Sequence, residues 1–299
     1  MYADTLGRLR QWEDTVWRSM AITLQQQLLT SQSRASASFS LPQTVIDRLA
    51  AKERLSEGVT LLPSFSVVTI GWSLLSSLAH ECVDIMCNFS ALPPLSELPL
   101  RRLVGDNQML RRCARAWYER GMTTLTNIDQ AVSYAVADVL RISLHPFLAA
   151  HADALTPFVD QYAWRRSYCP VCGGRPDLSF LDKEQGNRWL LCSRCDAQWL
   201  FQRIECPFCE NRNPGTLAYF VYDAALYRLY TCDRCRNYIK ALDLRQTESP
   251  PDLPAERLLT ADMDRQAIEQ QYQPGWLTTP PYHMTRRKPA PPEPESCDR

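Results

Sequence analysis

The N-terminal half of the sequence carries apolar residues with the period of a helix. From Met1 to about Asp160 glycine is rare, and apolar positions recur every three or four residues, which predicts helices with one buried face. Leu6, Leu9 and Trp12 set this spacing in the first segment. A second helix is expected to begin at Leu41-Pro42, because proline is favoured at the first helical position.

The most apolar stretch, Phe65 to Phe89, is interrupted by His80, Glu81 and Asp84. The uninterrupted run is too short for a membrane span, which needs about 20 apolar residues, so we expect a buried helix and no membrane insertion. Two more segments, Leu103 to Met122 and Asn127 to Ala150, keep the helical period. This half therefore predicts a bundle of about five helices.

The composition changes near Tyr162 to paired cysteines, glycines, prolines and aromatic runs. Leu217 to Tyr222 and Tyr227 to Thr231 are typical of strands. After a polar, proline-rich segment, Ala255 to Tyr272 returns to a helical pattern, and we expect that helix to pack back on the rest. From Pro274 onward the prolines and cations predict an extended tail.

These patterns together predict an α+β protein built from a helical bundle, two small metal modules, one further helix and a tail. Its expected parts are a bundle over 1–163, a first four-cysteine module over 164–203, a second over 204–246, a C-terminal helix over 247–273 and a Pro-rich disordered tail over 274–299.

Eight of the twelve cysteines form four Cys-x-x-Cys pairs, and the pattern is written twice. The gap between paired motifs is nineteen residues in the first copy and twenty-two in the second, which indicates an internal duplication. The candidate metal ligands are Cys169, Cys172, Cys192, Cys195, Cys206, Cys209, Cys232 and Cys235.

Two cysteines three positions apart on a tight turn can direct both sulfur atoms at one ion, and a hairpin brings a second turn alongside. We therefore predict two four-thiolate sites, of rubredoxin or zinc-ribbon type, in preference to disulfides or thioredoxin-like redox pairs. Sequential pairing within each copy is the simpler arrangement, and a cross-braced one is its rival. Four thiolates suit iron or zinc equally. An ion with four thiolate ligands has no open coordination position for hydrolysis. The sequence also contains no glycine-rich phosphate loop, no nucleophile with a paired histidine and no catalytic carboxylate pair, so we do not expect an enzyme.

The balance of charges and the free cysteines indicate where in the cell the protein is expected. The 33 basic and 33 acidic side chains cancel, so no global field favours nucleic acid or an anionic membrane. The N-terminus lacks the pattern of a secretory signal, and thiols without an export signal indicate the reducing cytoplasm. We expect the scattered histidines to lie on helix surfaces or in the core. We expect Cys82, Cys87 and Cys113 to be buried and to pack as small apolar residues.

Arginines near the cysteine turns support an alternative function. These residues are Arg165, Arg166, Arg194, Arg203, Arg234 and Arg236. They could bind nucleic acid, as in a zinc-ribbon protein, or compensate the negative charge of two thiolate sites. The second interpretation is the simpler one, and a small iron redox module is a further alternative.

The order and flanks of the pairs resemble the formate dehydrogenase accessory protein family, FdhE. The matching stretches are Tyr168-Cys-Pro-Val-Cys-Gly173, Leu191-Cys-Ser-Arg-Cys195, Glu205-Cys-Pro-Phe-Cys209 and Thr231-Cys-Asp-Arg-Cys235. The resemblance covers about 164–272 and reaches the bundle only in general character. It implies a cytoplasmic, non-catalytic assembly factor that binds iron in a rubredoxin-like manner. It also implies contact with the catalytic subunit of a respiratory formate dehydrogenase.

Overall fold

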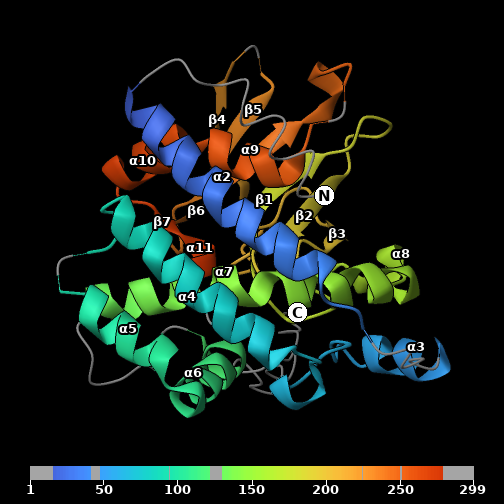
Figure 1. Ribbon diagram of the computed structural model, residues 1–299. Coiled ribbons are helices and arrows are strands. Elements are labelled where there is room, and N and C mark those ends of the chain that lie inside the picture. Colours follow the sequence, from blue (N-terminus) through green and yellow to red (C-terminus); the bar gives the residue numbers. More distant parts are fainter. Residues whose placement is uncertain are drawn as a thin grey trace, which may run out of the picture.

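The computed structural model describes residues 16–41, 48–93, 95–121, 130–223, 225–249 and 251–278. Helices come first along the chain and strands follow (Figure 1), so the predicted α+β class is confirmed. Three sequence expectations lie outside the described residues. They are the first segment with Leu6, Leu9 and Trp12, the helix start at Pro42, and the tail beyond Thr278 with His283 and Cys297.

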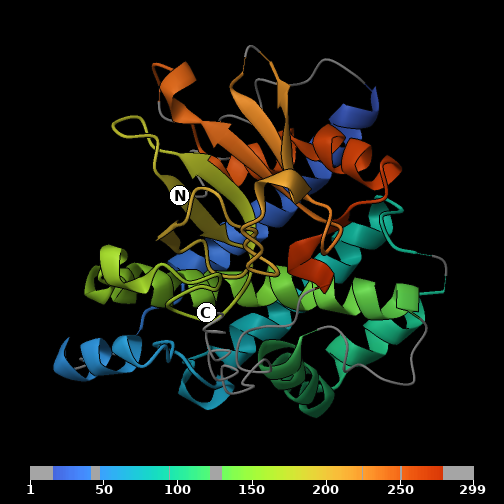
Figure 2. The ribbon, with the colours of Figure 1, turned by 180° about the vertical axis from the view of Figure 1, so that it is seen from behind.

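The helical half packs around one long helix. Its members are α2 (Val16–Ala37), α3 (Arg48–Ser56), α4 (Trp72–Asn88), α5 (Glu97–Gly105), α6 (Asn107–Arg120) and α7 (Gln130–Leu155). Helix α7 contacts α2, α4, α5 and α6. Figure 1 shows it crossing the middle of the molecule, with the sheet above and α5 and α6 below, and Figure 2 shows the same order from behind.

Helix boundaries differ from the sequence expectations where polar residues intervene. The expected single helix over Leu103–Met122 is two helices, because Asp106 has an extended backbone and its carboxylate accepts hydrogen bonds from the N–H groups of Gln108 and Met109. A side chain that satisfies free N–H groups starts a new helix. The apolar stretch from Phe65 contains a 3-10 turn, Phe65–Val67, before α4 begins at Trp72.

A 3-10 turn, a short helix and a loop lead from the bundle into the sheet. They are the 3-10 turn Thr156–Phe158, the helix α8 (Gln161–Trp164) and the loop to Tyr168. Asp160 caps α8 by accepting from the N–H groups of Tyr162 and Ala163. The Trp164 indole donates to the Tyr168 carbonyl at 2.9 Å, so the chain enters the first cysteine turn in a fixed position.

The described strands form one sheet of seven. They are β1 (Pro176–Leu181), β2 (Arg188–Cys192), β3 (Gln198–Phe201), β4 (Leu217–Tyr222), β5 (Tyr227–Cys232), β6 (Asn237–Asp243) and β7 (Gln273–Pro274). The order is β3-β2-β1-β6-β5-β4, with β7 beside β6. Each repeat contributes three antiparallel strands, and the parallel pair β1–β6 joins them. Both joining strands are buried along their whole length, as expected for strands covered on both faces.

The C-terminal helical region is broken at Thr260. Helix α9 (Leu253–Leu259) and helix α10 (Ala261–Glu269) replace the single helix expected over Ala255–Tyr272. The Thr260 hydroxyl donates to the Glu256 carbonyl at 2.6 Å, an interaction that bends helices. The buried Lys240 ammonium of β6 donates to the Arg257 carbonyl at 2.9 Å and to the Asp264 carboxylate at 2.6 Å. These bonds hold both helices on the sheet.

The first residues of the expected extended tail are ordered. Gly275–Thr278 form a short helix, α11, because Trp276 packs edge-on against the Tyr238 ring at 5.7 Å. A Cβ atom at Gly275 would come within 2.4 Å of the Phe208 ring, so glycine is the residue that permits this approach.

One buried ion-pair group connects α9 to the first cysteine module. The Arg257 guanidinium lies 2.7 Å from the Asp177 carboxylate and 2.9 Å from that of Asp196. The imidazole of His145, on α7, pairs with the same Asp196 at 2.9 Å. Burial alone would raise the pKa of Asp196, but Arg257 and His145 hold this pKa well below its ordinary value. Three distant parts of the chain therefore meet at Asp196.

We expect Arg257→Met to lower the free energy of unfolding by about 3–5 kcal/mol, because the buried carboxylates of Asp177 and Asp196 would lose the guanidinium that they share and Asp196 would keep only His145. Urea denaturation measures this loss. Arg265→Met is the matched control, since Arg265 lies on α10 in an exposed pair with Asp262, and its cost should stay below about 1 kcal/mol. Equal effects of the two substitutions would contradict this account.

Candidate metal centres

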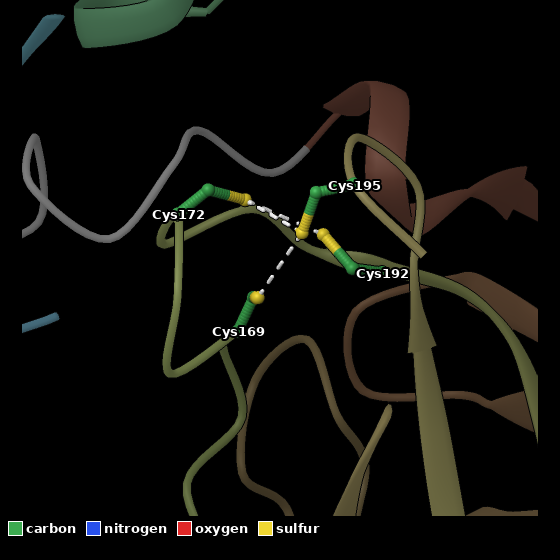
Figure 3. Close-up of side chains that lie close together, drawn as sticks. All are labelled: Cys169, Cys172, Cys192 and Cys195. Carbon is green, nitrogen blue, oxygen red and sulfur yellow. Dashed lines mark hydrogen bonds between the residues drawn. The ribbon is translucent and has the colours of Figure 1, made fainter. Parts of the chain in front are cut away.

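The first four cysteines converge in the interior from two turns. Cys169 and Cys172 lie on the turn before β1, and Cys192 and Cys195 lie on the turn between β2 and β3. Their sulfur atoms lie within 4.8 Å of one another. The closest pairs are Cys172–Cys192 and Cys172–Cys195 at 3.5 Å and Cys169–Cys195 at 3.7 Å (Figure 3). All four residues are at most 1% exposed.

The last four cysteines form a second group of the same kind. Cys206 and Cys209 precede β4, and Cys232 and Cys235 lie on the turn between β5 and β6. The sulfurs of Cys206 and Cys235, and those of Cys209 and Cys232, are 3.7 Å apart. The structure thus groups the cysteines sequentially, first pair with second and third with fourth, and not in the cross-braced arrangement.

All four turns use one backbone design. In each, the N–H of the residue four positions after the first cysteine donates to that cysteine's carbonyl, at 2.8–3.3 Å. The same residue has a positive φ, between 56° and 71°. These residues are Gly173, Asp196, Glu210 and Arg236. A left-handed residue directly after the second cysteine closes the turn tightly, so that both thiols of the motif lie on the same side.

The sulfur spacing fits a tetrahedral ion. A disulfide bond is about 2.05 Å long, so sulfurs 3.5–3.7 Å apart are not joined, and all eight thiols are free. Four sulfurs placed about 2.3 Å from a central iron or zinc ion would be roughly 3.8 Å apart. Each group therefore has nearly the dimensions of a four-thiolate site.

In each group the hydrogen bonds favour the thiolate form of one cysteine, whereas the pKa values of Cys169, Cys195, Cys206 and Cys209 are raised. Burial alone would raise the pKa of Cys172. Hydrogen bonds from Cys169, Cys192 and Cys195 nevertheless hold this pKa well below its ordinary value. In the second group, a hydrogen bond from Cys206 lowers the pKa of Cys235 to about 5, and the Asn237 N–H contributes. A thiolate is the form that binds metal.

A residue within one cysteine motif and another just outside a motif also support the sulfurs. The Arg194 backbone N–H lies 3.4 Å from the Cys192 sulfur, and the Asn211 amide donates to the Cys232 sulfur at 3.6 Å. Such contacts orient ligands and stabilise their charge. Sequence reasoning did not single out Asn211; its position two residues after Cys209, within the turn, was the available signal.

The bundle covers the first group. The N–H groups of Leu61 and Leu62 donate to the carbonyls of Pro170 and Val171 at 2.9 and 2.8 Å. The Tyr168 hydroxyl donates to the Gly58 carbonyl at 2.9 Å. One hydrophobic cluster runs from the bundle helices through the cysteines of this group to the strands and on to Cys206 and Cys232 of the second group. In the first group all four cysteines are buried members of this cluster, whereas Cys209 and Cys235 of the second are only partly buried.

Among the six arginines considered for nucleic-acid binding, Arg194 is buried inside the protein. Its guanidinium donates to the carbonyls of Tyr118 and Trp117, at 2.9 and 3.1 Å, near the end of α6. It also lies 4.5 Å from the centre of the Trp117 ring. Arg236 pairs with Asp233 and stacks on Tyr272. For Arg194 and Arg236 these contacts favour an intramolecular role over nucleic-acid binding.

Within the described ranges the remaining histidines and cysteines take ordinary structural positions. His151 accepts from the Thr69 N–H at 2.9 Å, and burial lowers its pKa. His80 bonds the Ser76 carbonyl of its own helix. Cys82 is fully buried, while Cys87 and Cys113 are partly buried.

Comparison with known proteins relates the first cysteine group to one protein family. The model of the family described as "FdhE, central domain" matches residues 168–203, which contain the whole first cysteine group. A relative from Aquifex aeolicus named "Protein FdhE homolog" is 38% identical over 132 residues, which is 42% of this chain and 45% of the relative. The chain is therefore similar to FdhE proteins in its first cysteine group and over part of its length. The resemblance expected from the cysteine motifs is thereby confirmed.

The other matches define how far the likeness reaches. "Protein FdhE" of Escherichia coli O127:H6 is 32% identical over 116 residues, 38% of this chain and 37% of that protein. The chain thus matches less than half the length of these curated relatives. The crystal structure of the FdhE protein from Pseudomonas aeruginosa has a TM-score of 0.56 at 19% identity and covers 91% of both chains, which shows a shared fold. None of the described helices is long and apolar enough to cross a membrane.

The two repeats offer a matched test of the contact with the bundle. Arg194 and Arg234 occupy the same position in the second and fourth Cys-x-x-Cys motifs, but Arg194 is buried and Arg234 is exposed. We expect Arg194→Leu to lower the free energy of unfolding by about 2–4 kcal/mol, because two buried carbonyls lose a charged donor. Arg234→Leu should change it by less than about 0.5 kcal/mol. Chemical denaturation of both variants checks the difference, and equal losses would refute it.

Proposed function

We propose that this chain is a cytoplasmic, non-catalytic assembly factor for a respiratory formate dehydrogenase. In this proposal it binds the catalytic subunit of that enzyme. Its eight paired cysteines hold two ions, each iron or zinc, in four-thiolate sites. The single observation that carries the proposal is the pair of four-sulfur groups with tetrahedral dimensions. The family resemblance supplies the partner.

The donor set limits the chemistry that these sites can perform. Four thiolates fill a tetrahedral ion, so no position remains for a substrate or an activated water. Iron in such a site can exchange one electron, whereas zinc only holds structure. The chain's own residues position the turns and stabilise the thiolates through N–H groups. A binding role accounts for these features without any reaction at the ion.

Metal content is the first test. Full-length protein purified without air should contain two ions per chain by elemental analysis, and Cys172→Ser should reduce this count to one. Because binding energy of a structural ion is folding energy, on the order of 10 kcal/mol, the variant should also melt at a lower temperature. Iron would give a red ferric-thiolate colour that bleaches on reduction, and zinc would give none.

The matched control is Cys87→Ser, which changes a partly buried thiol outside both groups and should keep two ions. Wild-type protein without bound metal, or with its paired cysteines joined as disulfides, would overturn the proposed sites.

Partner binding is the second test. The tagged full-length chain, expressed in cells in which formate dehydrogenase is induced, should recover the catalytic subunit of that enzyme after nuclease treatment. Cys113→Ser, again outside both groups, should recover as much. Recovery of nucleic acid before nuclease treatment, and of no dehydrogenase subunit after it, would instead support the zinc-ribbon alternative.

A further inference from the structure

The two four-cysteine groups share a ligand set but differ in exposure. In the first group the exposed fractions are 0% for Cys169, Cys172 and Cys192 and 1% for Cys195. In the second, Cys206 and Cys232 are buried while Cys209 and Cys235 are partly exposed. Since the ligands and turn geometry are the same, the difference arises from what packs on each group.

Elements distant in sequence seal the first group. The loop before the first 3-10 turn donates two backbone hydrogen bonds to the Pro170 and Val171 carbonyls. On the opposite turn, Arg194 is bonded to the end of α6, and Arg257 donates to the Cys192 carbonyl at 3.2 Å. To reach an ion there, a ligand would have to separate the sheet from the bundle, so opening is close to global unfolding.

The second group adjoins open space. A cavity of about 240 Å³ is lined by Cys206 and Cys232 and by the rings of Phe208, Tyr219 and Tyr230. One wall of it is β4, which lies at the edge of the sheet. Tyr219 and Val221 of that strand are more than half exposed. The β4–β5 hairpin stands away from the bundle at the top of Figures 1 and 2.

On its exposed side the second group contacts the C-terminal segment: the Tyr272 hydroxyl donates to Asp233 at 2.6 Å and Arg236 donates to the Gln270 carbonyl at 2.9 Å. Glu210 and Arg234, which flank Cys209 and Cys235, are both exposed. Arg234 occupies the position that Arg194 uses to bind the bundle. A local movement of these two turns would therefore expose the sulfurs while the bundle stays packed on the first group, although Cys206 and Cys232 also belong to the shared hydrophobic cluster.

We propose that the second group is an exchange site for a thiophilic ion, whereas the first retains its ion as long as the protein is folded. This rests on the proposed metal binding. In the exchange step an incoming anionic ligand bonds to the ion as the bond to the Cys209 or Cys235 sulfur breaks, and the released thiolate takes a proton from water. The ion keeps its oxidation state throughout, so no oxidant or reductant is needed.

The test follows the release of zinc from full-length protein loaded with two zinc ions without air. An excess of the coloured chelator 4-(2-pyridylazo)resorcinol is added, and the absorbance of its zinc complex is recorded. We expect two phases of one equivalent each, with the first at least about tenfold faster than the second. The second should follow the rate of unfolding as urea is added.

Two further measurements assign the phases. Cys209→Ser should remove the fast phase and leave the slow one unchanged. Wild-type protein alkylated with iodoacetamide after the fast phase should carry label on Cys206, Cys209, Cys232 and Cys235, and not on the four cysteines of the first group. This second measurement needs no variant to fold.

The outcomes separate the two proposals. A chain that binds fewer than two zinc ions would overturn the proposed metal sites themselves. Two ions that leave at one rate, or alkylation spread over both groups after one equivalent is lost, would overturn only the division between an exchange site and a permanent one.

Discussion

The convergence of four sulfur atoms in a buried space is the constraint on which the rest of the cysteine-rich half depends. Sulfurs 3.5–3.7 Å apart leave room for an ion and for nothing larger. The chain reaches this spacing only if both turns of a group bend tightly, and each turn does so through a left-handed residue. The two turns of each group are joined by an antiparallel hairpin, β1–β2 in the first group and β4–β5 in the second.

The sheet carries this constraint from one repeat to the other. Strands β1 and β6 pair in parallel from Leu178 with Lys240 to Leu181 with Asp243, so each repeat forms an edge for the other. The two three-stranded units also share helices that pack on them, since α9 contacts β1, α10 contacts β6, and α11 contacts both. The duplicated modules are therefore one folded body with two sites, built on a common sheet.

Local patterns predicted the features that depend on neighbouring residues. The cysteine spacing predicted four turns and left their grouping open between a sequential and a cross-braced arrangement. The aromatic runs predicted β4 and β5 within one residue of their ends. The apolar period predicted α4, α6 and α7. What failed depended on single polar residues or on distant contacts. Asp106 and Thr260 each divide an expected helix, and the order of α11 depends on packing of Trp276 against Tyr238.

The same distinction between local and distant contacts explains why the two copies differ in character although their motifs match. Arg194 and Arg234 are identical residues in equivalent turns, and only the position of α6 turns the first into a buried connection. Asp196 likewise gains His145 and Arg257 as partners, whereas its counterpart Arg236 contacts Tyr272 near the surface. Duplication supplies two equal thiolate groups. The bundle then packs on one of them, and burial of that group makes it a core element while the other stays within reach of solvent.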